Sequence, residues 1–260
     1  MEAREKRETA SNVVDGDLAL NDSVPIAHAV APNFQLNTQK QASVSYLVVK
    51  RCFDFLTSLV ASVVLLIPLA ILVVLVVIQD FGNPFYIQKR VGQNGKELRV
   101  AKLRSMRKNA DQLENVLTPE QLEEYRREYK LTDDPRLIGY KKPGDGRRCF
   151  GGVIRRASLD ELPQIVWNIC IKGNMSVVGP RPILQDELEK NYTPEQQAIL
   201  LSVKPGLTGY WQAYARNNAV YETGERQRME LYYAQNRSVA LDAKILFASV
   251  GAVIKGKGAV

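Results

Sequence analysis

The stretch FLTSLVASVVLLIPLAILVVLVVI, from Phe55 to Ile78, decides the fold of this chain. Its 24 residues include no charged side chain, and most of them are Leu, Val, Ile and Ala. A bilayer is crossed by a helix of roughly 20 apolar residues, so the stretch is long enough. A buried helix of a soluble protein rarely runs this far without a polar face. The stretch therefore predicts a helix inserted in a membrane.

The residues around the apolar stretch leave two arrangements open. Lys50 and Arg51 precede it, and a second basic group follows it: Lys89, Arg90, Lys96, Arg99, Lys102 and Arg104. Basic flanks favour the cytoplasmic side of a membrane, and here both flanks are basic. Pro68, near the middle, removes one backbone hydrogen bond and clashes with the preceding turn. A re-entrant helix that breaks near Ile67-Pro68 and leaves by the same face fits, as does a plain transmembrane helix with a proline kink.

Charge and length outside this stretch indicate a domain with an anionic partner. The chain has 260 residues, 45% of them hydrophobic, and a formal net charge of +7. That length suits one domain with appendages. Residues 44–109 carry 10 Lys or Arg against 3 Asp or Glu. A local basic surface favours phosphate, nucleic acid or acidic lipid as a partner.

The scarcity of cysteine and histidine argues against several kinds of site. The chain has 3 cysteines and no CxxC pair, which argues against a disulfide framework and for a reducing compartment. His28, in a polar segment, is the only histidine. A zinc site and Ser-His-Asp or Cys-His catalysis are therefore not expected.

The pattern along the chain predicts an α+β, mainly helical fold. We expect a polar and mostly disordered tail over 1–45, the membrane helix over 46–81 and a domain over 82–260. Asn94-Gly95, between short β-prone runs, predicts a β-hairpin. Predicted helices in the domain cover 110–130, 159–171, 182–201, 222–236 and 240–254, with a restart at Thr193-Pro194. The last helix is amphipathic, so it either lies in the membrane interface or packs on the domain.

Candidate chemistry begins where the 159–171 helix begins. Ser158 and Glu161 fit a capping box, and acidic residues in a first turn suit the helix dipole, so a purely structural role is open. The same geometry favours an ionised Asp160 that could act as a nucleophile. Glu161 could hold a divalent cation, and Arg155 and Arg156 could clamp phosphate oxygens.

Two later segments hold further candidates. Prolines on both sides of Arg181 fix the backbone there, which limits the freedom lost when the guanidinium grips an anion. A rigid turn with a solvated arginine is the alternative. The segment Lys204–Gln212 reads as a turn with aromatic residues, and Arg216 follows it.

Taken in order, these motifs resemble the bacterial sugar transferase family, the monotopic polyprenyl-phosphate sugar-phosphate transferases. The resemblance runs from about residue 46 to 254 and rests on five segments: Lys50-Arg51-x-x-Asp54, Lys102-Leu103-Arg104-Ser105-Met106, Ser158-Leu159-Asp160-Glu161-Leu162-Pro163-Gln164, Lys172–Pro182 and Lys204–Gly209. Several ordered motifs over most of a chain form a highly specific signal.

The resemblance implies a fold and a reaction. It implies a re-entrant membrane helix broken near Pro68, with Lys50, Arg51 and Asp54 at its start, and a small catalytic domain on the cytosolic face of the bacterial inner membrane. Asp160 would attack the sugar-bearing phosphate of a UDP-sugar and release UMP. Glu161 would help bind Mg²⁺.

The acceptor implied by the resemblance is polyprenyl (undecaprenyl) phosphate, and the product would start a surface glycan or exopolysaccharide. The basic residues of the motifs are the expected substrate contacts: Arg155, Arg181, Lys102, Arg104, Lys204 and Arg216. Membrane lipids are expected partners and nucleic acid is not, since no nucleic-acid motif is present. A homodimer stays open.

The chain also departs from the family pattern. Asn174 stands where members usually have Asp, and the segment Tyr210–Arg216 replaces a variant of Leu-Trp-Gln-Val-Ser-Gly-Arg. The charged segment 110–150 is longer than in the smallest members. The competing hypothesis is therefore a membrane-anchored scaffold or inactive homologue that binds anions through the basic residues on either side of the apolar stretch.

Overall fold

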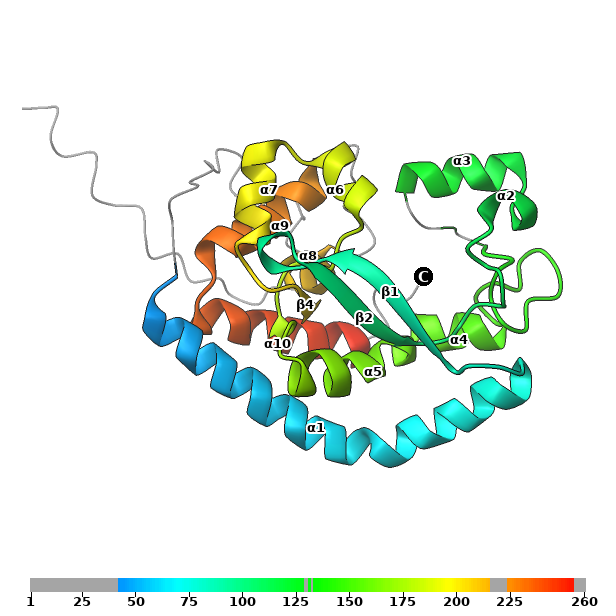
Figure 1. Cartoon of the computed structure of the whole chain (residues 1–260), viewed down its shortest axis with the longest axis horizontal. Coiled ribbons are helices and arrows are strands. Elements are labelled where there is room, and N and C mark those ends of the chain that lie inside the picture. The colour runs from blue at the N-terminus through cyan, green and yellow to red at the C-terminus, as the bar shows by residue number, and fades with distance from the viewer. Residues whose placement is uncertain (1–41, 129–130, 132, 216–223, 255–260) are drawn as a thin grey trace, which may run out of the picture.

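The long helix α1 (Val44–Gln79) lies under the rest of the molecule in this computed structural model (Figure 1). The structure describes residues 42–128, 131, 133–215 and 224–254, so the predicted tail over 1–45 falls almost wholly outside it. Helix α1 begins at Val44, two residues earlier than the predicted boundary.

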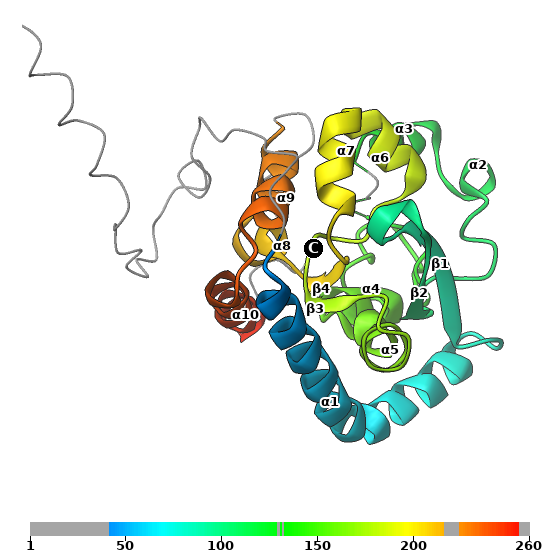
Figure 2. The same ribbon diagram turned by 60° about the vertical axis from the view of Figure 1, so that its left-hand side comes forward.

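Helix α1 is bent but helical through Pro68. The helix runs for 36 residues, so the expected break near Ile67-Pro68 is not an interruption of the helix. Figures 1 and 2 instead show two arms that meet at an angle. Bending is how a helix accommodates the proline ring and the missing N–H donor.

The convex side of α1 is apolar and exposed. Val63, Leu66 and Ile67 are 71%, 68% and 70% exposed, and only 6% of the most apolar window is buried. Among the described residues, α1 is the one helix long and apolar enough to cross a membrane. This exposure excludes the buried core helix of a soluble protein, which would cover its apolar side chains with other protein.

Both arms of α1 contact the same domain. In the first arm, Asp54 is 3% exposed and accepts the Val177 N–H at 3.0 Å. In the second arm, Val76 is fully buried against Leu103 and Ile154. The two ends of the helix therefore lie on one side of the exposed middle.

The predicted hairpin is confirmed. Strands β1 (Phe85–Val91) and β2 (Glu97–Leu103) pair antiparallel, with Phe85 opposite Leu103 and Val91 opposite Glu97. The turn η2 (Gln93–Gly95) places Asn94 and Gly95 at φ values of 58° and 73°. Asn and Gly tolerate this left-handed conformation better than other residues, which is why the dipeptide marks hairpins.

A second, parallel pair joins two distant motifs. Strands β3 (Ser176–Val178) and β4 (Gly206–Thr208) pair with Ser176 opposite Gly206. A Cβ on Gly206 would lie 2.1 Å from the Gly179 nitrogen, so only glycine permits this approach. The pairing holds the Val178–Pro182 segment against the Lys204–Gly209 turn, a contact that the sequence did not predict.

Helices form the rest of the domain, and the mainly helical fold is confirmed. The predicted helix over 110–130 divides in two at Thr118, whose hydroxyl accepts the Gln121 N–H at 3.3 Å, and the helix over 182–201 also divides in two. The shorter helices are α2 (Leu113–Val116), α3 (Pro119–Glu128), α4 (Phe150–Arg156), α6 (Gln185–Asn191), α7 (Pro194–Leu201), α8 (Tyr210–Tyr214) and α9 (Glu225–Asn236).

The last helix, α10 (Val239–Ile254), is apolar on two sides. Its inner side packs on the core, where Ile245 is fully buried. On its outer side Phe247 and Val250 are 80% and 58% exposed. The helix contacts both α1 and α8. It therefore packs on the domain, beside the first arm of α1, and still presents apolar side chains outward (Figure 2).

Candidate active site

The candidate acids lie on a tight turn. Ser158 has a φ of 56° and its side chain makes no capping bond within the described residues, so the capping-box prediction is wrong. The Glu161 N–H donates instead to the Ser158 carbonyl at 3.2 Å. The chain continues as the 3₁₀ turn η3 (Leu159–Glu161), the short helix α5 (Leu162–Gln164) and the π-helix η4 (Ile165–Ile171), with Pro163 in the first turn of α5.

Lys102 joins the two acids of this turn. Its Nζ lies 4.0 Å from Asp160 Oδ2 and 3.9 Å from Glu161 Oε1. Asp160 is only 7% exposed, and burial raises the pKa of its carboxyl to about 6, while the nearby Lys102 ammonium lowers it. Burial in turn lowers the pKa of Lys102, and the two carboxylates counteract that shift. Asp160 is thus a carboxylate held out of water, compensated chiefly by Lys102 and further by Arg155.

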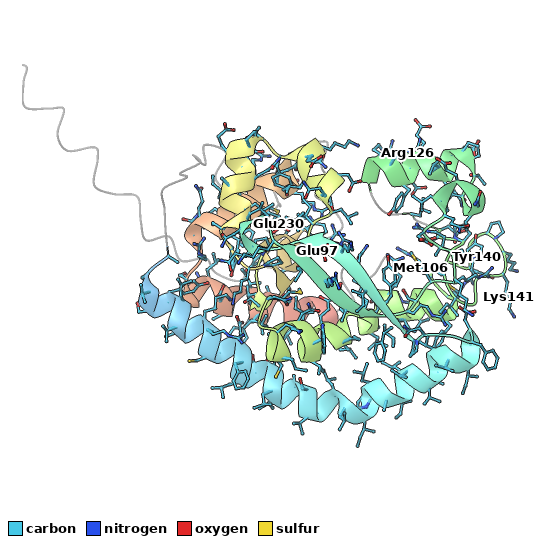
Figure 3. All side chains as sticks on the ribbon, viewed as in Figure 1. Glu97, Met106, Arg126, Tyr140, Lys141 and Glu230 are labelled. Carbon is cyan, nitrogen blue, oxygen red and sulfur yellow. The ribbon has the colours of Figure 1, made fainter. Side chains whose placement is uncertain are left out.

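A basic cavity of about 590 Å³ opens over Asp160. It lies between the hairpin and the segment 104–156, and ten Lys or Arg residues line it against three Asp. The basic residues nearest the predicted motifs are Arg90, Lys102, Arg104, Arg155, Arg156 and Arg181. Met106, labelled in Figure 3, lines the side away from α6. Such a surplus of positive charge suits a ligand with several phosphate charges.

Arg155 is oriented by an acid that the sequence analysis did not single out. Arg155 Nη1 lies 3.5 Å from Asp134 Oδ2, and its side chain is 41% exposed. Asp134 itself is buried and holds Arg136 through two bonds of 2.8 Å. Arg136 also lies over the ring of Tyr125, 4.7 Å from its centroid. Asp134 therefore links Arg155 to the buried Arg136.

Arg181 is held at both ends by buried acids. Its Nη1 donates to Glu187 Oε1 at 3.1 Å, and its backbone N–H donates to the Glu230 carboxyl at 3.3 Å. Burial raises the pKa of Glu230 to about 7, and the arginines around it counteract the rise. Figure 3 shows Glu230 among the side chains of α9. These acids, together with the two flanking prolines, orient Arg181.

The other predicted substrate contacts are dispersed. Arg104 lines the cavity and pairs with Asp80 at 3.1 Å, at the end of α1. Lys204 donates to the Gly173 carbonyl at 2.9 Å and lies near Arg51, at the other arm of α1. Arg216 lies outside the described residues. The structure thus places Arg104 with Asp160 and places Lys204 elsewhere.

Of the residues predicted at the membrane, Lys50, Arg51 and Asp54 face the domain, whereas Pro68 is exposed in the middle of α1. Lys50 donates to Asp242 Oδ2 at 2.9 Å, and Tyr46 donates to the same oxygen at 3.0 Å. Arg51 donates to the Ile169 carbonyl at 3.3 Å. Because Asp242 lies on α10, the bonds of Lys50 and Tyr46 fasten the start of α1 to the last helix.

Asn174 has a structural contact. Its Oδ1 accepts a bond of 3.1 Å from Asn168 Nδ2, and Asn168 also binds the backbone of β2 at Arg99 and Ala101. Asn168 is fully buried. An amide oxygen suffices to accept this bond. Asn174, in place of the usual Asp, therefore preserves the link between η4 and β2.

The sequence analysis missed Asp134, Glu187 and Glu230. One signal could have suggested Glu187, because it follows Leu184 by three residues and its carboxylate accepts the Leu184 N–H at 3.2 Å, as at many helix starts. Asp134 and Glu230 stand in sequence contexts that resemble ordinary surface loops and helices, so their burial follows only from the fold.

The acids of the turn suit a magnesium ion. Among the described residues, no group of three or more His, Cys, Asp or Glu side chains could hold a metal. Asp160 and Glu161 place carboxylate oxygens at and beside the basic cavity. Mg²⁺ is usually held by one or two carboxylates together with substrate phosphates and water, so this pair fits it better than a metal that needs a closed protein cage.

Comparison with known proteins identifies the family of this chain. The model of the family described as bacterial sugar transferase matches residues 45–256. The chain is 40% identical over 213 residues to the exopolysaccharide production protein ExoY of Sinorhizobium fredii, covering 80% of this chain and 87% of that one.

Two longer relatives match the same region. The chain is 38% identical to a UDP-galactose-lipid carrier transferase of Erwinia amylovora and 37% identical to an undecaprenyl-phosphate galactose phosphotransferase of Salmonella typhimurium. Each match covers 81% of this chain and 41% of the relative. The family match over more than three quarters of the chain confirms the resemblance seen in its motifs: the chain belongs to the bacterial sugar transferase family, a family of enzymes.

Proposed function

We propose that the protein transfers a sugar-1-phosphate from a UDP-sugar to undecaprenyl phosphate and so starts the assembly of an exopolysaccharide or another surface glycan. The observation that carries this proposal is a buried carboxylate, Asp160, beside Lys102 in a strongly basic cavity, in a domain packed on a helix long and apolar enough to cross a membrane. The names of the Erwinia and Salmonella relatives, which mention a lipid carrier and undecaprenyl phosphate, support the acceptor class.

The reaction proceeds in two displacements. Asp160 Oδ attacks the phosphorus that bears the sugar, an acyl-phosphate bond forms, and the bond to the bridging oxygen breaks so that UMP leaves. An oxygen of undecaprenyl phosphate then attacks the same phosphorus and releases the Asp160 carboxylate. The first product leaves before the lipid reacts, so one cavity serves a soluble donor and a membrane acceptor in turn.

The basic side chains supply charge at both steps. Lys102 keeps Asp160 paired in the absence of substrate. Arg155 and Arg181 bind the phosphate oxygens and stabilise the negative charge that shifts among those oxygens during each displacement. Glu161, with Asp160, would hold Mg²⁺, which neutralises diphosphate charge when it is bound. Fixed cations of this kind lower the barrier because they need no reorientation during the reaction.

We propose that α1 is re-entrant and that the domain lies on the cytosolic face of the inner membrane. The contacts of Asp54 and Val76 with one domain, on either side of an exposed apolar bend, support this arrangement. A straight helix of 36 residues would separate its ends by roughly 54 Å at 1.5 Å per residue, whereas the bend brings both arms of α1 against the same domain. The exposed Phe247 and Val250 of α10 would lie in the membrane interface beside it.

A UMP-release assay tests the proposed function. Purified protein in lipid nanodiscs with undecaprenyl phosphate and Mg²⁺ should release UMP from at least one member of a panel of UDP-sugars. The lipid product should carry both the sugar and its phosphate by mass spectrometry. Absence of turnover with every UDP-sugar would favour the alternative, a non-catalytic anchor that binds anions.

Cysteine labelling tests the arrangement of α1. Single cysteines at Ser43 and at Asn83, in a variant that lacks the native cysteines, should both react with an impermeant maleimide from the cytosolic side only. Ser43 precedes α1 and Asn83 follows it, so the pair reports both ends of the helix. Labelling of the two positions from opposite faces would establish a plain transmembrane helix instead.

A further inference from the structure

Arg181 belongs to a charged cluster whose two glutamates have no role in the proposed reaction steps. Its members are three arginines and two glutamates: Arg90, Arg181, Arg226, Glu187 and Glu230. Glu187 is fully buried. Its carboxylate lies 3.1 Å from Arg181 Nη1, 3.2 Å from Arg226 Nη2 and 3.5 Å from Arg90 Nη1. One acid therefore connects β1, the Pro180–Pro182 segment, α6 and α9.

The three arginines differ in what else they face. Arg90 and Arg181 both line the cavity, but the side chains of Arg90 and Arg226 are only 9% exposed, whereas that of Arg181 is 29% exposed. Arg90 also donates to the Pro182 carbonyl and to Gln88, and Arg226 stacks on Trp211 at 4.2 Å. The two inner arginines thus act as scaffold, while Arg181 is the one with a substantially accessible face.

The balance of charge points the cluster outward. Three arginines against at most two ionised glutamates leave at least one positive charge in excess, and the most exposed of the three arginines is Arg181. Burying a carboxylate such as Glu187 is costly unless it is fully paired, so its retention at this place needs the cations around it. An arginine held by a buried acid keeps its guanidinium plane fixed and loses little freedom when it binds phosphate.

We propose that Glu187 is a positioning residue, which sets the guanidinium of Arg181 for the phosphate oxygens of the bound substrate. This inference rests on the proposed function, since it takes a phosphorylated substrate as the ligand. The phosphate could belong to the UDP-sugar or to undecaprenyl phosphate. Either way, the effect of Glu187 passes through Arg181.

The test is a double-mutant cycle of Glu187→Asp and Arg181→Ala, with Glu189→Asp as the matched control. Glu187→Asp shortens the side chain by one methylene, which moves the carboxylate away from Arg181. The negative charge stays in the cluster, and with it the charge pairing needed for folding. Glu189 is two residues away on the same helix and is exposed. Steady-state kinetics in nanodiscs, with each substrate varied in turn, gives KM and kcat, and the melting temperature reports folding.

Glu187→Asp should raise the KM of one substrate by about tenfold, the size of effect expected when the group that orients a ligand-binding side chain moves. In the Arg181→Ala background the same change should have little further effect on KM. A rise confined to the UDP-sugar assigns the phosphate to the donor, and a rise confined to undecaprenyl phosphate assigns it to the acceptor. Glu189→Asp should match the wild type.

Several outcomes would overturn the inference. Equal effects of Glu187→Asp in the presence and absence of Arg181 would show that Glu187 acts independently of Arg181. A lower melting temperature with unchanged KM would reduce Glu187 to a structural role. If Glu187→Asp does not fold, Arg181→Lys decides: a KM equal to that of the wild type would mean that the held guanidinium is not needed. A wild-type protein inactive on every UDP-sugar would instead reject the proposed function.

Discussion

Replacement of Asp160 by Ala should abolish UMP release, with a loss of at least about 10³-fold in kcat, the scale seen when a nucleophile is removed. The expectation follows from the position of this carboxylate. It is 7% exposed, it lines the basic cavity, and its one close cation is Lys102 at 4.0 Å among the interactions of the described residues. If this carboxylate oxygen forms the new bond to phosphorus, the first displacement needs no serine, threonine or cysteine nucleophile.

The covalent step gives this prediction a second readout. Wild-type protein incubated with UDP-sugar and no lipid acceptor should carry a phospho-sugar adduct, and peptide mass spectrometry should place it on Asp160. Asp186→Ala is the matched control, because Asp186 is exposed in the first turn of α6. Full activity of the Asp160 variant, or an adduct on another residue, would remove Asp160 from this role.

The features predicted best from the sequence are those set by local chemistry. A run of 24 uncharged residues predicts a membrane helix whatever follows it, and Asn94-Gly95 predicts a hairpin because few other dipeptides adopt its turn. The turn that carries Asp160 was found as a motif, yet its capping was predicted wrongly. Ser158 takes a left-handed conformation that the pattern Ser-x-x-Glu does not reveal.

The contacts that complete the site depend on residues far apart in the sequence. Lys102 reaches Asp160 because β2 packs against the turn after α4, and Glu187 reaches Arg90 across nearly 100 residues. Such pairs arise from tertiary packing, so they cannot be predicted from a single sequence. The same reason explains Lys204, a basic residue of a recognised motif that lies beside α1 and Gly173.

Replacement of Lys102 by Met should reduce kcat by about 10²-fold, as when one fixed charge-stabilising donor is lost from an active site. Lys102 is the only cation recorded within 4.0 Å of either acid of the turn among the described residues. Without it, Asp160 and Glu161 lie side by side with no compensating charge so close. Like charges and burial both disfavour the ionised form that attacks phosphorus. Methionine fills a similar volume, so the hairpin should keep its packing.

The matched control for Lys102 is Lys89→Met. Lys89 lies on the paired strand of the same hairpin, and its side chain is 74% exposed in a surface pair with Glu97. Such exposed pairs contribute little, so this variant should keep wild-type kcat.

The pH dependence of the rate adds a readout that misfolding would not produce. Because the lysine lowers the pKa of Asp160, the Lys102 variant should need a higher pH to reach half of its own maximal rate. A pH profile that matches the wild type would show that Lys102 does not control the ionisation of Asp160.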